Sequence, residues 1–531
     1  MIDDRRARIQ LNQQTLAAKL KPRYDFIVCG SGSSGSVVAR RLAENPDVSV
    51  LLLEAGGSDD LPEIMDPLRW PALRRGEQDW SFNAQPNPRL NGRAIPLSMG
   101  RVLGGGSAIN VMIWSRGHKS DWDFFAAESG DEGWNYQSVL QIYRRIENWH
   151  GAADPARRGT DGLVYVQPAP NPHPLAAAMI EAFEATGVPA FHDQNGVMME
   201  GQGGAALSNL CIRDGRRQSI FRSYVYPYMD RSNLTVLMGA LVTRLTLEGR
   251  RITGVEFAWQ GRMHQVAAAF EVVLSLGAIQ TPKLLMQSGI GDESELKRLG
   301  IPLVQHLPGV GQNFQDHFMA PCVWEAPEPI ERRNNMAEAT AIWRSDAAIV
   351  VPDLQTILVE APYASPQVAK DPLPPNSWSL TNAALRTASR GRLRLTGPDP
   401  YDAIAIDANC LDDPADLKAL KRCVEYCRDV ASSSHLKSFV KRELLPGRVT
   451  EAELEDFIRN ATVSHSHESC TAKMGRDSMS VVDHQLRIHG LQNVRIADGS
   501  VLPRVTTGNT MAPCVVIGER AGDFLKTAHR L

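Results

Sequence analysis

Long hydrophobic runs are missing from this 531-residue sequence. No stretch of about 18 apolar residues occurs anywhere, which excludes an ordinary membrane-spanning helix. Residues 1–8 are charged and lead into polar sequence, so they lack the apolar centre of a secretory signal peptide. From these absences we expect a cytoplasmic protein with no membrane span.

An excess of either charge is missing as well. The chain has 57 basic and 60 acidic residues and a formal net charge of −3. This balance gives no reason to expect a nucleic acid or an anionic membrane as a partner. The eight cysteines form no Cys-x-x-Cys pair and no zinc-like spacing with histidine. We therefore expect no metal site, and the sparse cysteines fit a reducing compartment.

What the chain does contain is enough sequence for more than one compact core. Residues 25–29 and 48–53 are short, apolar, branched-rich runs that are typical of buried parallel strands. Residues 37–45 predict a helix between them, which completes a βαβ unit. The segment 56–100 is rich in Pro, Gly and Trp, with little periodicity, and is typical of chain that wraps a ligand.

A glycine-rich turn, Gly30-Ser31-Gly32-Ser33-Ser34-Gly35, joins the first strand to the helix. Glycines at this spacing allow a tight turn, close approach of backbone N–H groups to a pyrophosphate, and close packing of helix on strand. The helix N-terminus adds partial positive charge. Glu54 ends the second strand about 20 residues later, where an acid binds ribose hydroxyls. The pattern predicts a dinucleotide site and leaves NAD and FAD both open.

Later segments resemble the signatures of the glucose–methanol–choline (GMC) oxidoreductases. Residues 100–110, Gly-Arg-Val-Leu-Gly-Gly-Gly-Ser-Ala-Ile-Asn, resemble the first family signature, and residues 277–291 resemble the second. Residues 467–475 resemble the segment that carries the catalytic histidine, and 494–500 and 509–520 continue the likeness. The matches run in family order from residue 24 to the C-terminus. Within the family the chain is most similar to pyridoxine oxidase-like and choline-oxidising bacterial members.

The resemblance implies an α/β protein with two parts. A Rossmann-like FAD-binding domain is expected from residues 1–155, 206–320 and 461–531. A substrate domain, built on an antiparallel sheet with helices, is expected from 156–205 and 321–460. Together with the glycine turn, the resemblance predicts that FAD is held by Gly30, Gly32, Ser33, Ser34, Gly35, Glu54, Ala55, Arg101, Gly105, Gly106, Asn110, Val111, Val242, Asp498, Gly499, Asn509, Thr510 and Met511.

Alcohol oxidation by a flavin removes the hydroxyl proton and a hydride from the same carbon, and the flavin accepts the hydride. The protein must supply a base and a donor that holds the oxygen. His467 matches the family's catalytic histidine, and Asn509 matches its partner site. His465, two residues before that histidine, is interpreted as a supporting group or an exposed side chain, with the second favoured.

Several positions bear on cofactor attachment and substrate. Some choline-oxidising relatives attach FAD covalently through a histidine, but the matching position here is Leu97, which has no nucleophilic atom, so we expect dissociable FAD. Ser466 stands where relatives carry an aromatic or bulky residue that faces the substrate. Glu325 resembles the glutamate that meets the trimethylammonium of choline, and Trp70 resembles an aromatic of that cation cage.

The sequence thus predicts FAD-dependent oxidation of an uncharged primary alcohol to an aldehyde, with oxygen, a quinone or another electron carrier as acceptor. A choline-like amino-alcohol is the alternative substrate. A nicotinamide dehydrogenase would have no use for the two later signatures. An FAD-containing hydroxynitrile lyase shares the fold without reducing its flavin, and the intact His467 and Asn509 disfavour a non-catalytic flavin-binding scaffold. No pattern indicates an oligomeric state.

Overall fold

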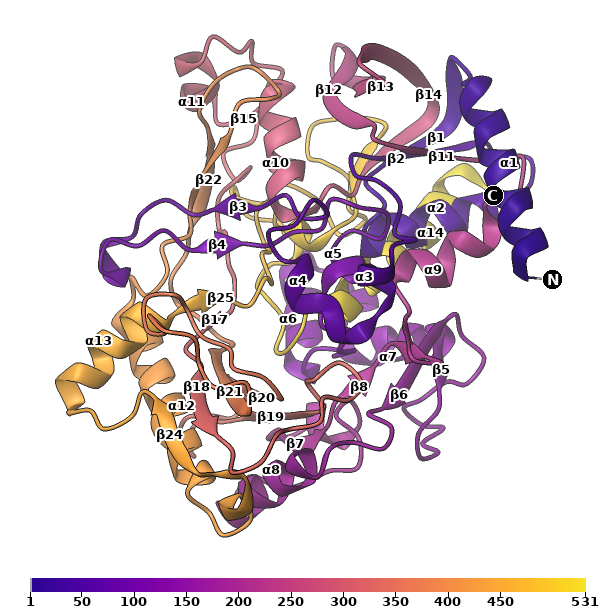
Figure 1. Ribbon diagram of the computed structural model, residues 1–531. Helices are drawn as coiled ribbons and strands as arrows, with labels where there is room; N and C mark the ends of the chain where they lie inside the picture. The colour runs from indigo at the N-terminus through magenta and orange to yellow at the C-terminus, as the bar shows by residue number, and fades with distance from the viewer. Residues whose placement is uncertain (1) are drawn as a thin grey trace.

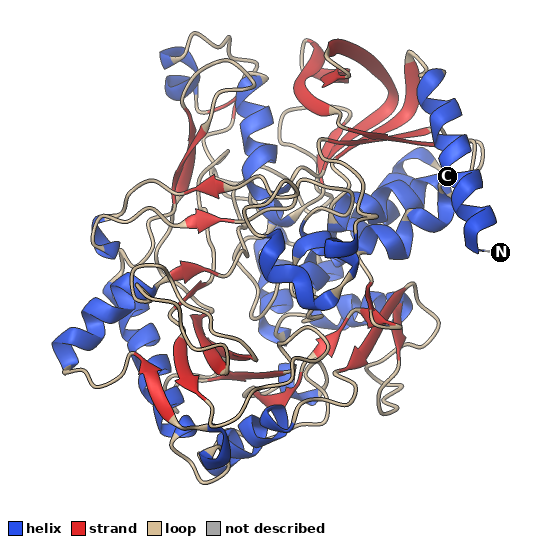
Figure 2. Cartoon of the chain, in the orientation of Figure 1, coloured by secondary structure: helices blue, strands red, loops and turns tan. Residues whose placement is uncertain are grey.

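Two large β-sheets, one mostly parallel and one antiparallel, organise the protein in a computed structural model that describes residues 2–531. Figure 1 shows the parallel sheet on the side of the two termini and the antiparallel sheet at the opposite end of the molecule. Helices and strands are interleaved along the chain (Figure 2). The predicted α/β fold class is confirmed.

The parallel sheet contains the predicted βαβ unit. Its strands follow the order β11 (Leu234–Met238), β2 (Val50–Glu54), β1 (Arg23–Cys29), β14 (Arg262–Leu274) and β26 (Val494–Ile496), and all these neighbours are parallel. β13 (Arg251–Trp259) pairs antiparallel with the first half of β14 and, on its other side, with β12 (Leu241–Glu248). β2 is buried along its whole length, as expected for a strand covered on both faces.

Helix α2 (Ser33–Ala43) begins directly after Gly32, four residues before the predicted start of 37. The two serines after this glycine form the first helical turn instead of extending the loop. α2 packs against the C-terminal helix α14 (Met511–His529), and Figure 1 shows the two lying together. The contact is close, because a Cβ on Gly518 would lie 2.7 Å from the Ser34 carbonyl oxygen. The C-terminal helix therefore packs beside the glycine turn near the start of the chain.

The second sheet is antiparallel throughout, as predicted. Its strands follow the order β24 (Arg442–Leu445), β18 (Cys322–Glu325), β21 (Ser377–Ala384), β20 (Leu354–Val359), β19 (Ala339–Trp343) and β7 (Gly204–Leu207). The short strands β17 (Phe318–Met319) and β25 (Val463–Ser464) extend it beside β21. Helices α12 (Pro414–Ala431) and α8 (Pro174–Ala185) pack against its strands. β17 and β25 lie just outside the predicted range 321–460.

Shorter elements connect and flank the sheets. They are α1 (Ile2–Ala18), α3 (Pro62–Met65), α4 (Trp70–Leu73), β3 (Phe82–Asn83), β4 (Pro96–Leu97), α5 (Gly106–Ile109), α6 (Lys119–Ser129), α7 (Tyr136–Ile146), β5 (Glu147–Trp149), β6 (Val164–Pro168), β8 (Asn209–Leu210), β9 (Ile212–Arg213), β10 (Arg216–Arg217), α9 (Ile220–Tyr224), α10 (Gly277–Gln287), β15 (Ile290–Gly291), α11 (Glu293–Arg298), β16 (Gln305–His306), β22 (Arg392–Leu395), β23 (Ile404–Asp407) and α13 (Glu451–Ala461). Segment 56–100 contains only short pieces of regular structure.

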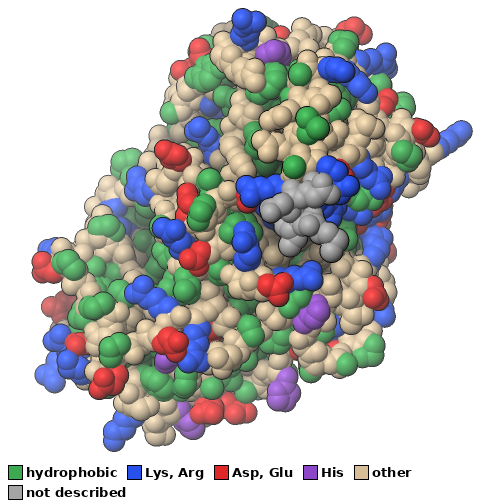
Figure 3. All heavy atoms as spheres, turned by 45° about the vertical axis from the view of Figure 1, so that its right-hand side comes forward, with side chains coloured by type: hydrophobic (Ala, Val, Ile, Leu, Met, Phe, Trp, Pro, Cys, Tyr) green, Lys and Arg blue, Asp and Glu red, His purple; other side chains and the backbone are tan. Residues whose placement is uncertain are grey.

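Basic and acidic side chains are interspersed on the face drawn in Figure 3, in line with the balanced composition. Within residues 2–531, no helix is both long and apolar enough to cross a bilayer. All eight cysteines are free thiols, and seven of them are buried.

Candidate active site

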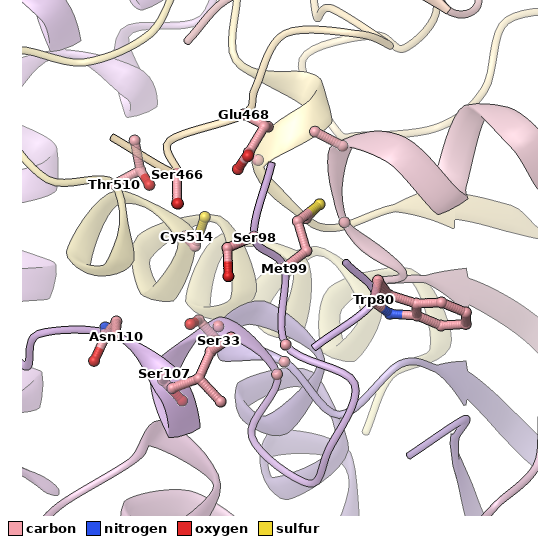
Figure 4. A pocket seen from close by; sticks show the side chains of 18 of the residues that line it. Ser33, Trp80, Ser98, Met99, Ser107, Asn110, Ser466, Glu468, Thr510 and Cys514 are labelled. Atoms are coloured by element: carbon pink, nitrogen blue, oxygen red, sulfur yellow. The ribbon is translucent and has the colours of Figure 1, made fainter. Parts of the chain in front are cut away.

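A cavity of about 390 Å³ is lined by residues of both sheets. One wall comes from the carboxyl ends of β1 and β2, where open α/β sheets bind their ligands. The other wall comes from β17, β20 and β21 of the antiparallel sheet. Figure 4 shows Ser466 and Glu468 on one side of this cavity, and Ser33, Ser107 and Asn110 on the other.

Most of the residues predicted from sequence line this cavity. They are Gly30, Gly32, Ser33, Ser34, Glu54, Ala55, Trp70, Gly105, Gly106, Asn110, Val111, Val242, Ser466, His467, Asp498, Gly499, Asn509, Thr510 and Met511. Gly35, Arg101 and Glu325 do not line it. The structure thus gathers segments more than 450 residues apart in sequence around one space.

Gly35 and Arg101 have structural positions instead. A Cβ on Gly35 would lie 1.9 Å from the Gly30 carbonyl oxygen, so this glycine permits close packing of helix on turn rather than touching a ligand. Arg101 is exposed, and its guanidinium carbon lies 5.4 Å from the centre of the Trp80 ring. Neither residue lines the cavity, and their contact with the cofactor stays a prediction.

The glycine turn is braced by the acid at the end of β2. Glu54 accepts hydrogen bonds from the Ser31 backbone N–H (3.1 Å), the Ser31 hydroxyl (2.7 Å) and the Gly56 N–H (2.9 Å). Burial raises the pKa of Glu54, and these hydrogen bonds oppose that shift by favouring the charged form. Glu54 therefore fixes the turn and still lines the cavity, where a ribose would lie.

The cavity wall fits the pyrophosphate of a dinucleotide. α2 has no side-chain cap, so its first N–H groups are free to bind an anion. A Cβ on Gly32 or Gly106 would meet no protein atom, so a bound group can press against bare backbone there. Asp498 is held by the Gly277 N–H (3.0 Å) and the Thr281 hydroxyl (2.6 Å), and it also caps a short helix through the Ser500 N–H (2.9 Å).

Three histidines meet on the opposite side. The Nδ1 atoms of His317 and His467 lie 2.8 Å apart, and His465 Nδ1 lies 3.2 Å from both ring nitrogens of His467. Asn509 Nδ2 lies 3.3 Å from His467 Nε2. Because an amide NH₂ can only donate, His467 Nε2 accepts this bond and carries a lone pair. The ring proton of His467 is then on Nδ1, which donates to His317.

Burial sets the charge of this cluster. Loss of water lowers the pKa of His467 well below its ordinary value, and the neighbouring His465 and His317 lower it further. The pKa of His317 falls to about 3 and that of His465 to about 4, in both cases mainly through burial. All three rings are therefore neutral at pH 7. A neutral imidazole with an unprotonated Nε2 can accept a proton from a hydroxyl group placed beside it.

Sequence patterns missed His317. Strand β17 pairs with β25 in the register Phe318↔Ser464, and the His465 backbone N–H donates to the His317 carbonyl oxygen at 2.8 Å. This pairing places the two histidines next to each other although 148 positions separate them in the chain. Nothing in the local sequence around His317 signals it, because the pairing exists only after the sheet has formed. His465, favoured as an exposed side chain, lies half-buried in the cluster.

The carboxyl groups of Asp316 and Glu468 directly precede His317 and directly follow His467 in the chain. Asp316 accepts from the His467 backbone N–H (2.9 Å) and from the Ser464 hydroxyl, which fixes the histidine backbone. Burial raises the pKa of Asp316 to about 6. Glu468 is buried, and one of its oxygens, Oε1, has no hydrogen-bond partner among the described residues. Burial and then the charge of Asp316 raise the pKa of Glu468 well above its usual range, which favours its neutral form.

The substrate side of the cavity is partly aromatic. Trp70 is buried, donates its indole N–H to the Asn335 carbonyl oxygen at 2.9 Å, and lies 6.3 Å from the Tyr363 ring centre. Ser466 faces the cavity with a small hydroxyl (Figure 4). The φ of Ser466 is 60°, which is uncommon for a residue with a Cβ. Ser466 directly precedes His467, which lines the cavity.

Glu325 is the one predicted substrate-side residue that does not line the cavity. It lies on β18 and forms ion pairs with Lys441 (2.7 Å) and Arg442 (2.6 Å) at the edge of the antiparallel sheet. Hydrogen bonds from these two cations lower the pKa of Glu325 below its usual value. Its charge is paired with these two cations of the same chain, and the contact of Glu325 with a substrate cation stays a prediction.

Comparison with known proteins agrees with this arrangement. Two family models described as GMC oxidoreductase match residues 24–319 and 387–518. The chain is 34% identical over 533 residues to an oxygen-dependent choline dehydrogenase of Paraburkholderia xenovorans, covering 95% of this chain and 94% of that protein. It is 33% identical to the mitochondrial choline dehydrogenase of Mus musculus, covering 97% and 91%. The crystal structure of pyridoxine 4-oxidase from Mesorbium loti superposes with a TM-score of 0.90 at 32% identity, covering 96% and 99%.

Proposed function

The chain belongs to the GMC oxidoreductase family and is an FAD-dependent enzyme that acts on CH–OH groups, and from this premise we propose how its own residues carry out the reaction. His467 is the base that removes the hydroxyl proton of a primary alcohol, and Asn509 holds the oxygen. The observation that carries the proposal is the lone pair of His467 Nε2, which faces the same cavity as the glycine turn.

Bound FAD supplies the hydride acceptor for the alcohol carbon. Residues around the glycine turn and the start of α14 would hold it: Gly32, Ser33, Glu54, Gly106, Asp498 and Thr510. The parallel sheet with its flanking helices forms the proposed FAD-binding part, and the antiparallel sheet forms the proposed substrate part. Leu97 is buried on β4 and offers no atom for covalent attachment, which supports dissociable FAD.

The proton moves within the histidine cluster. His467 Nε2 takes the hydroxyl proton, and the positive charge that develops is stabilised through the Nδ1–H bond to neutral His317. The Nδ2 group of Asn509, which lies beside His467 Nε2, has a second N–H that can donate to the substrate oxygen and stabilise negative charge there. Gln355 keeps that amide in place through a 3.4 Å contact with its oxygen.

Mutation of the base tests the proposal. His467→Ala should retain FAD but reduce it at least 100-fold more slowly when mixed anaerobically with alcohols, because positioned bases contribute about 10²–10⁴-fold. Stopped-flow bleaching of flavin absorbance is the measurement. Reduction at the wild-type rate would remove His467 from the mechanism. Wild-type protein that turns over cyanohydrins without any bleaching would instead indicate a hydroxynitrile lyase.

A choline-like amino-alcohol is the second candidate substrate. It is supported by the choline dehydrogenases among the relatives and by Trp70, whose ring lines the cavity. The names of the relatives also support molecular oxygen as one acceptor. Admission of oxygen to the reduced enzyme, with detection of peroxide, distinguishes oxygen from a quinone or another carrier. A cytoplasmic location remains part of the proposal.

A further inference from the structure

The guanidinium group of Arg74 lies in the cavity wall. Several interior arginines have carboxylate partners, as in the pairs Arg116–Glu147, Arg158–Asp193, Arg222–Asp59 and Arg495–Glu271, whereas the buried Arg217 donates to backbone oxygens of Ile64 and Asn110. Arg74 has no ion-pair partner among residues 5–531 and, unlike Arg217, faces the cavity. Its one side-chain hydrogen bond goes to the hydroxyl oxygen of Tyr363. A guanidinium has five N–H donors in a planar fork, so most of its donors are left for a ligand.

The acids near Arg74 are engaged elsewhere. Asp79 accepts from the Met99 N–H (3.0 Å) and the Ser98 hydroxyl, and Asp316 accepts from the histidine segment. Glu468 points into the cavity (Figure 4), and burial raises its pKa well above its usual range. The three acids stabilise the charge of Arg74 through space, but none of them forms an ion pair with it among residues 5–531. The free N–H donors of Arg74 therefore remain available in the cavity wall.

Arg74 also lies near the reacting centre. Its charge contributes to the lowered pKa of His465, and His465 is in contact with the proposed base. Its partner Tyr363 packs 6.3 Å from Trp70, centre to centre, so cation and aromatic wall form one surface. A substrate ring against Trp70 would present its substituents to Arg74. Bidentate pairing of guanidinium with carboxylate is the geometry that such a fork favours.

We propose that Arg74, positioned by Tyr363, is a specificity-determining residue that binds a carboxylate on the substrate, so that the preferred alcohols are hydroxymethyl compounds carrying an anionic group. This inference rests on the proposed alcohol oxidation and names its substrate class. A cationic amino-alcohol would meet the positive charge of Arg74, and Glu325, which is paired with Lys441 and Arg442, does not line the cavity. The geometry accordingly disfavours choline at this site.

The test compares 4-(hydroxymethyl)benzoate, 4-methylbenzyl alcohol and choline in anaerobic flavin reduction. The wild-type protein should prefer the carboxylate at least tenfold in apparent Kd over the neutral alcohol, as expected for one charge-assisted pair. Arg74→Gln should abolish that preference. Arg69→Gln, at an exposed arginine outside the cavity, is the matched control and should keep the preference.

Binding of 4-methylbenzoate and 4-methylbenzamide, followed by changes in flavin absorbance, gives a readout that needs no turnover. If the wild type binds the benzoate more tightly and Arg74→Gln does not, the inference is supported, even if no alcohol reduces the flavin. The absence of flavin reduction would instead contradict the proposed alcohol oxidation. Equal binding of the two ligands to the wild type, or an unchanged ratio in Arg74→Gln, overturns the inference. If Arg74→Gln does not fold, two other measurements decide. They are the ratio of benzoate to benzamide affinity in the wild type and the same ratio in Tyr363→Phe, where the preference for the benzoate should weaken several-fold.

Discussion

Replacement of His317 by leucine isolates the part of the site that no sequence pattern signalled. Leucine is apolar and close to histidine in size, so it leaves the packing of β17 largely intact. It removes the Nδ1 acceptor that lies 2.8 Å from His467 and leaves that buried N–H with only the longer 3.2 Å contact to His465 Nδ1. An unpaired buried donor costs about 1–3 kcal/mol, and hydrogen bonds to a charged group are stronger than neutral ones.

The loss of hydrogen-bond free energy mainly raises the barrier of the step in which His467 becomes charged. At about 1.4 kcal/mol per factor of ten, flavin reduction should slow by about 10- to 100-fold. FAD content and the apparent Kd for the alcohol should change little, because His317 does not line the cavity. With a pKa of about 3, His317 is neutral across the assay range, so the deficit should be constant from pH 6 to 9.

The assay is anaerobic stopped-flow reduction of the bound flavin, with the alcohol at saturating concentration. His317→Asn is the matched control, because an amide oxygen can accept from His467 and should restore most of the rate. A leucine variant that reduces flavin as fast as the wild type would refute the positioning role. Equal defects in the leucine and asparagine variants would show that packing, rather than the hydrogen bond, matters.

Further changes probe the cofactor wall and the charge of the base. Gly35→Ala should lower the free energy of unfolding by about 3 kcal/mol, measured by urea denaturation, because its Cβ would meet the Gly30 carbonyl oxygen at 1.9 Å. Glu54→Gln should weaken FAD binding about tenfold in a titration of the apoprotein; unchanged affinity would contradict contact with the ribose. Because burial lowers the pKa of His467, its neutral, active form persists as pH falls, so flavin reduction should decline only well below pH 6.5; a midpoint at or above 6.5 would contradict this.

Local sequence determined the cofactor half of the protein. The glycine turn, the apolar runs around it and Glu54 follow from backbone geometry and strand burial, so they specify a dinucleotide site within one βαβ unit. The start of α2 was placed too late because serine fits both a loop and a first helical turn, and the helix continued into the turn. The family signatures placed His467 and Asn509 on the same cavity, although they come from separate segments.

Only the tertiary structure decided the surroundings of the base and the substrate wall. His317 reaches His467 through the register of β17 with β25, and Arg74 reaches the cavity from an irregular segment with no periodic signal. Glu325 matched a substrate residue by sequence, but strand pairing gave it two cations at the sheet edge. The physical reason is common to all three positions. Which charge meets which partner depends on contacts between segments distant in sequence, and such contacts leave no pattern along the chain.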